Sequence, residues 1–146
     1  MALYTVTKTS AAASITNDSV TILASSTKPL RVYIVDIKGD GTASAANEIL
    51  LSRSTGGTTA GGAITPSKVV STSSAASFTT ATTWSAQPTL GDTLWRFSVN
   101  ANGGIDKFIA VPGAEISVPV SGQLSIRSID GTSNIIINML IEEIDG

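Results

Sequence analysis

The feature that most constrains the fold is a succession of short apolar and β-branched runs, separated by Gly, Pro, Asn and Asp, with almost no helical period. Each run is long enough for one strand, and each break carries residues that favour turns. Strands are expected at residues 3–7, 20–24, 30–38, 48–54, 94–100, 107–111, 115–120, 123–129 and 134–143. About eight or nine short strands without intervening helices predict an all-β fold, an antiparallel β-sandwich or jelly roll. The length predicts one domain spanning residues 1–146.

Two of these strands show how their faces should divide, because successive side chains point to opposite sides of a sheet. In the last strand the odd-numbered residues from Ile135 to Ile141 are all apolar, so they are expected in the core, while the other face is mixed. The segment 30–38 is apolar or aromatic on both faces, with residues 30, 32 and 34 on one face and residues 33, 35 and 37 on the other. That strand should therefore be covered on its second face, by a loop in preference to another subunit.

The segment 54–83 interrupts the strand pattern. It is mainly Ser, Thr, Gly and Ala, a composition typical of a mobile linker. A structureless loop of that length is uncommon in a compact domain, so contacts with the body of the domain or with a partner are expected to order it. The run 63–70 is a candidate for an extra edge strand.

The charge content is low. Charged residues make up 14% of the chain, against about 25% in a typical soluble domain, while there are 20 Ser and 19 Thr. Hydroxyl-rich surfaces cost little to desolvate, so the chain is either a subunit that buries much of its surface or a monomer with a hydroxyl-rich surface.

The distribution of charge and apolar residues argues against two classes of partner. The net charge is −2 and the nine basic residues are scattered, which argues against direct nucleic-acid binding. No apolar run approaches the roughly 18 residues that span a bilayer, so no membrane partner is expected. The first residues lack the basic start and apolar region of a secretory signal.

The residue types leave little scope for catalysis. The chain has no His and no Cys, so a Ser-His-Asp triad and the usual zinc and iron ligand sets are not available. Asp36, Glu48 and Asp92 lie on or near strands, but no spacing marks two of them as the carboxylate pair of a hydrolase. The run 36–41 is expected to form a hairpin turn rather than a calcium loop. No catalytic residue, metal or cofactor is predicted.

Both tryptophans lie in the stretch 82–97. Trp95 and Phe97 alternate with polar residues along one strand, so both are predicted as core anchors. Trp84 instead closes the hydroxyl-rich segment. It could pin that segment onto the sheet, anchor a partner contact, or present a platform for sugars. With Gln87, Pro88 and Arg96 it forms the predicted partner-binding set.

Several segments, in order, resemble small virion proteins of tailed bacteriophages, namely capsid decoration or cement proteins. The segments are LYTVTKTSAAA, KPLRVYIVDIKG, EILLSRSTGGT, TTWSAQPTLGDTLWRFSVNANGG, PGAEISV and a last strand ending in IEE. The resemblance lies in pattern and order over most of the chain. It implies a sandwich subunit that forms homotrimers on the exterior of the virion and bridges neighbouring major capsid proteins. The alternative is a fibre or baseplate β-domain that recognises glycans on a host surface.

Overall fold

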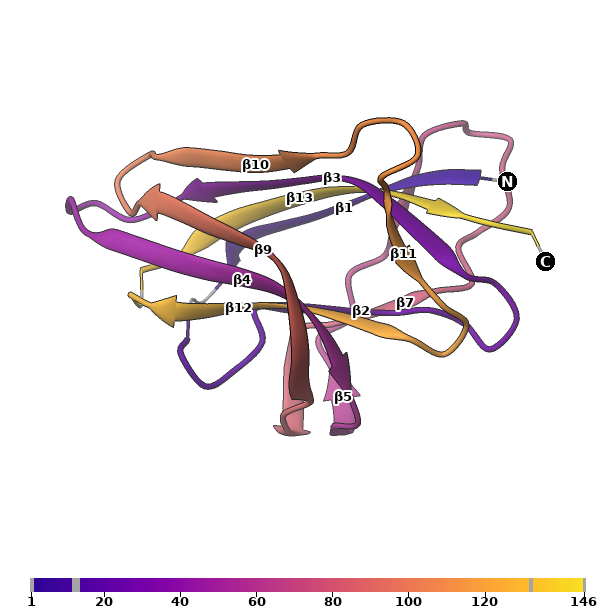
Figure 1. Cartoon of the computed structure of the whole chain (residues 1–146), viewed down its shortest axis with the longest axis horizontal. Helices are drawn as coiled ribbons and strands as arrows, with labels where there is room; N and C mark the ends of the chain where they lie inside the picture. The colour runs from indigo at the N-terminus through magenta and orange to yellow at the C-terminus, as the bar shows by residue number, and fades with distance from the viewer. Residues whose placement is uncertain (1, 12–13, 132, 146) are drawn as a thin grey trace.

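The computed structural model describes residues 2–11, 14–131 and 133–145, which form 13 strands and no helix. Two antiparallel sheets lie face to face (Figure 1). Sheet A has the order β10 (Ile105–Ile109), β3 (Leu30–Gly39), β13 (Ile135–Glu143), β1 (Ala2–Ala11) and β6 (Ser67–Lys68), and β11 (Ile116–Val118) also pairs with β3. Sheet B has the order β7 (Thr79–Ala81), β2 (Val20–Leu23), β12 (Gln123–Asp130), β4 (Ala46–Thr55) and β9 (Thr89–Asn100). β5 (Thr58–Gly61) and β8 (Thr83–Ala86) form a separate two-stranded sheet.

All nine expected strands correspond to observed ones, and the predicted all-β sandwich is confirmed. The more specific jelly-roll assignment stays a prediction. One core cluster joins the inner faces of both sheets. On β13 the predicted apolar face from Ile135 to Ile141 is buried, and Leu124 and Ile126 of β12 are buried in the same cluster. Complete burial of such a side chain contributes about 1.5–3 kcal/mol, so these alternating rows account for much of the drive to form the sandwich.

A bulge in β3 changes which of its residues face the core. Ile34 lies opposite Leu140 of β13, whereas Val32 lies opposite Ile141, so Tyr33 is the extra residue. The buried residues are 30 and 32 before the bulge and 35, 37 and 39 after it. The predicted division of this strand into one even-numbered and one odd-numbered apolar face is therefore wrong, because a bulge shifts the alternation by one residue. Ile34 consequently lies on the outer face of sheet A.

The prediction that Trp95 is a core anchor is also wrong. Phe97 is fully buried, but Trp95 is 43% exposed. The register between β4 and β9 shifts next to Trp95, and β9 and β10 are the edge strands of their sheets on the same side of the sandwich. The indole covers this open side by contacting Phe108 of β10, with ring centroids 5.2 Å apart. An inward side chain on an edge strand has a neighbouring strand on one side only, so a large part of Trp95 reaches solvent.

The hydroxyl-rich segment is more regular than its composition suggested. We call residues 56–88, between β4 and β9, the excursion. It contains β5, β6, β7 and β8, of which β6 extends sheet A and β7 extends sheet B. The β5–β8 pair projects at the bottom of the view in Figure 1. The extra edge strand proposed at 63–70 is limited to Ser67–Lys68, which pairs with β1.

Candidate functional site

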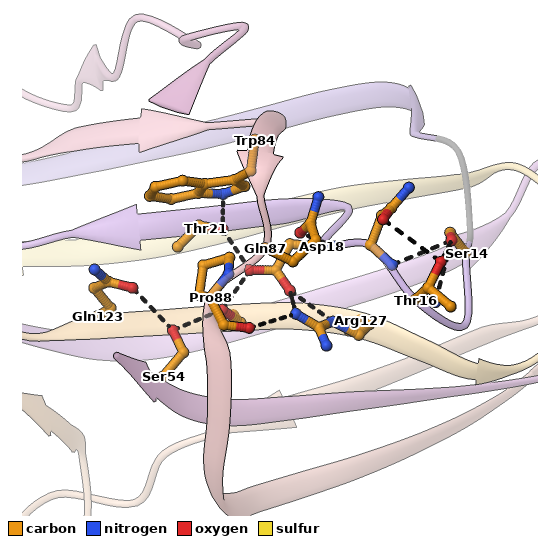
Figure 2. Close-up of polar contacts among 12 residues, drawn as sticks. Ser14, Thr16, Asp18, Thr21, Ser54, Trp84, Gln87, Pro88, Gln123 and Arg127 are labelled. Carbon is orange, nitrogen blue, oxygen red and sulfur yellow. Dashed lines mark hydrogen bonds and ion pairs between the residues drawn. The ribbon is translucent and has the colours of Figure 1, made fainter. Parts of the chain in front are cut away.

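A network of polar side chains lies between sheet B and the end of the excursion (Figure 2). On β12, Leu124 and Ile126 point into the core, so the alternation places Gln123, Ser125 and Arg127 on the outer face. The other members come from separate parts of the chain. We call the set the Asp18 network; its members are Asp18, Thr21, Ser54, Trp84, Gln87, Pro88, Gln123, Ser125 and Arg127.

The carboxylate of Asp18 is the centre of this network, and the residue is only 3% exposed. Oδ2 accepts hydrogen bonds from Thr21 Oγ1 at 2.6 Å and from Ser125 Oγ at 2.5 Å. Oδ1 accepts from Arg127 Nε at 2.8 Å and lies 2.7 Å from Arg127 Nη2. A buried charge is tolerated when it is paired and its lone pairs are satisfied, and here both conditions hold.

Three of the four predicted partner-binding residues belong to this network and contact the chain's own body. Trp84 Nε1 donates to Thr21 Oγ1 at 3.0 Å. Gln87 Oε1 accepts from the Asp18 backbone N–H at 2.9 Å, and the Pro88 carbonyl accepts from Arg127 Nη2 at 3.0 Å. These bonds support the interpretation that Trp84 pins the excursion onto the sheet. Partner binding by these residues stays a prediction.

The fourth residue, Arg96, is not part of the network. It lies on β9, and its Nη2 makes an ion pair at 2.6 Å with Glu48 Oε2 on the neighbouring β4. Both side chains are partly exposed, so the pair belongs to the surface of sheet B.

The indole of Trp84 also packs against the start of the excursion. A Cβ atom at position 57 would lie 2.6 Å from Trp84 Cζ3, and Gly57 has a φ of +91°. Only glycine combines that conformation with space for the ring. Nearby, Gln123 Nε2 donates to the Gly56 carbonyl at 3.0 Å, so the first residues of the excursion are held as well as the last.

A second anchor holds the middle of the excursion beside sheet A. The buried Glu143, at the end of β13, accepts hydrogen bonds at Oε2 from the backbone N–H groups of Ser77 and Phe78, both at 2.9 Å. Tyr4 Oη donates to the Ser74 carbonyl at 2.8 Å, and its ring meets Phe78 edge-on at 5.6 Å between centroids. Burial raises the pKa of Tyr4, and the nearby Glu143 carboxylate raises it further.

A third buried carboxylate lies on the outer face of sheet A. The Tyr33 hydroxyl donates to Glu142 Oε2, and Arg31 Nη1 lies 3.9 Å from the same oxygen. The hydrogen bond to Glu142, followed by burial, raises the pKa of Tyr33. Asp18, Glu142 and Glu143 are thus all committed to contacts within the chain. Among the residues that the structure describes, no group of three or more His, Cys, Asp or Glu could hold a metal ion.

The sequence did not identify Asp18, Arg127 or Glu143 as anchors. Arg127 could have been suspected, because it shares the polar face of its predicted strand with residues 123 and 125. Asp18 and Glu143 carried no such signal. Each acts on a segment more than sixty positions away, at Arg127 and at Ser77 and Phe78 respectively.

The chain matches no family model, no curated protein and no solved structure. Within the described residues, no helix is long and apolar enough to cross a membrane. The fold and the site define an all-β sandwich whose buried polar groups hold its own long excursion in place.

Proposed function

We propose that this chain is a structural virion protein that binds the exterior of a phage capsid and stabilises the shell by bridging neighbouring major capsid proteins. One observation carries the proposal: the carboxylates of Asp18, Glu142 and Glu143 make contacts within the chain, while large apolar side chains are left exposed. Ile105 and Val111, at the start of β10 and just after it, are each more than half exposed. Exposed apolar side chains in one region are typical of surfaces that bind other proteins.

The low charge content supports the same proposal, because little hydration of ions must be given up when such a surface is covered. The proposed mechanism is additive. Each subunit makes a modest contact, and a homotrimer engages several neighbouring capsid proteins at once, so that weak contacts become a firm attachment. The pressure of packaged DNA, which pushes capsid proteins apart, is then opposed where they meet.

The test uses particles of the virus that encodes the chain, with and without its gene. We expect the protein in many copies over the shell, located by cryo-electron microscopy as density that is missing from the deletion particle. We also expect deletion particles to assemble but to release DNA at a lower temperature. Equal rupture temperatures would refute a stabilising role, and a few copies at the tail would favour the recognition alternative.

The glycan-recognition alternative needs an exposed aromatic platform, at Trp84 or at another aromatic residue. The indole N–H of Trp84 is bonded to Thr21, and the ring covers Gly57, which leaves less of the side chain for stacking on a sugar. At Trp84 the alternative therefore has little support in this structure.

A further inference from the structure

The outer faces of the two sheets differ in what covers them. The outer face of sheet B carries the Asp18 network and lies beneath the end of the excursion. The outer face of sheet A carries an apolar row instead: Ile109 lies opposite Ile34, and Ile34 lies opposite Leu140. Ile109 is 59% exposed. We call this surface the outer A face and define it by Ile34, Asp36, Lys107, Ile109, Asn138 and Leu140.

The apolar row separates two open depressions. One, of about 390 Å³, is bounded by Tyr33 and Glu142 in addition to the row. The other, of about 360 Å³, is bounded by Asp36 and Asn138 and shares Ile34 and Leu140 with the first. The face is therefore contoured, with a ridge of aliphatic side chains that a facing surface can interdigitate with.

The polar row beside this ridge is incompletely paired. Lys107 lies opposite Asp36, and Asp36 lies opposite Asn138. Asp36 Oδ1 is buried and has no hydrogen-bond partner among the described residues. Lys107 is exposed, and its ammonium makes no ion pair with any residue that the structure describes. Asp36 lines one of the open depressions and is the cross-strand neighbour of Lys107, so a carboxylate and an unpaired ammonium lie together on this face.

We propose that the outer A face is a self-association surface, on which a second copy of this chain docks about a two-fold axis. The face carries the acidic Asp36 and the basic Lys107 side by side. In a two-fold interface residue i contacts j while j contacts i, so a patch with both groups complements itself. Asp36 of one copy meets Lys107 of the other, and the aliphatic rows pack between them. A purely basic or acidic partner would satisfy only one of the two groups.

The size of the face sets the strength of this contact. The face lies on three strands about 4.8 Å apart, and β10 has five residues, so five residues per strand at about 3.3 Å cover roughly 240 Å² in projection. This is below the roughly 800 Å² per partner of a standard interface, so the association should be weak and should depend on concentration. The inference goes beyond the proposed function, because it concerns the isolated chain and needs no shell.

Analytical ultracentrifugation of the purified chain, from about 1 µM to about 1 mM, tests the proposal. We expect the wild-type mass to rise with concentration, and Ile109→Glu to have half the wild-type mass at the highest concentration. The matched control is Ile15→Glu, because Ile15 is also 59% exposed but lies on the loop before β2. It should keep the wild-type mass. A wild-type chain whose mass does not change, or an Ile109→Glu variant that associates as the control does, would overturn the proposal.

Charge reversal tests the pairing itself. Asp36→Lys and Lys107→Glu should each associate less than the wild type, because like charges then face each other across the axis. A mixture of the two variants restores both attractive contacts and should associate again as a heterodimer. Thermal unfolding of each variant establishes that it is folded. A mixture no heavier than its separate components, with both variants folded, would refute the pairing. Cross-linking of this face to the shell protein in a particle, without self-association in solution, would assign the face to the shell instead.

Discussion

Replacing Asp18 by Asn should lower the free energy of unfolding far more than such a conservative substitution suggests. The substitution keeps the volume but removes the charge that faces Arg127, whose side chain is only 14% exposed. It also exchanges an oxygen acceptor for an amide group at a site where two hydroxyls and a guanidinium donate. Removing one partner of a buried ion pair costs about 3–5 kcal/mol. A domain of this kind has about 5–15 kcal/mol of stability in total, so much of it would be lost.

Urea-induced unfolding at neutral pH measures this loss as a lower midpoint with an unchanged slope. The matched control is Glu48→Gln, which also removes the carboxylate of an arginine ion pair. The two pairs have nearly equal Nη2–oxygen distances, 2.7 Å for Asp18–Arg127 and 2.6 Å for Glu48–Arg96. They differ in exposure, and a partly exposed pair contributes only about 0–1 kcal/mol.

The comparison isolates burial as the cause. If Asp18→Asn lowers the free energy of unfolding by no more than Glu48→Gln does, burial does not make the Asp18–Arg127 pair more important than the exposed pair, and the reasoning is refuted. A double variant that combines Asp18→Asn with Arg127→Met should cost less than the sum of its single variants, because no uncompensated charge then remains. Additive costs would show that the two side chains act independently.

Three further predictions concern the excursion. Trp84→Phe removes the donor to Thr21 and should lower stability by about 1 kcal/mol, while limited proteolysis should cut the excursion faster than in the wild type. Gly57→Ala should cost more than Trp84→Phe, because its Cβ would overlap the indole at a positive φ; equal urea midpoints would contradict this. Since burial raises the pKa of Tyr4, the stability that its neutral form contributes is present below about pH 10 and is lost as the pH rises above that value. Tyr4→Phe should therefore flatten the alkaline fall in the unfolding midpoint, measured in a Lys28→Arg background so that Lys28 does not titrate in the same range.

The strands were predictable because their signal is local. In β13 four alternate apolar residues specify a buried face without reference to any other part of the chain, and the structure buries all four. β12 follows the same rule, with Leu124 and Ile126 inward. The turns between strands were marked by Gly, Pro, Asn and Asp for equally local reasons.

The errors arose where a residue's environment depends on the partner strand. Nothing in the segment 30–38 indicates that Tyr33 is an extra residue, because a bulge is defined by the register with β13. Trp95 alternates correctly with its neighbours along β9. Its exposure follows from the position of β9 at the edge of sheet B, which depends on the order of strands far apart in sequence.

The order of the excursion shows why composition can mislead about long polar segments. Fixing the backbone costs about 1–2 kcal/mol per residue, and a Ser/Thr/Gly-rich segment has few apolar side chains to offset this. Here the compensation comes from the body: Gln123 holds Gly56, Glu143 holds Ser77 and Phe78, and Thr21 holds Trp84. These anchors divide one long loop into shorter ones, each with a smaller entropy of closure. Trp84 and Gln87 of the excursion also bond to the body through their own side chains, and Phe78 is buried in the core. The signal for order therefore lies only partly within the segment that is ordered.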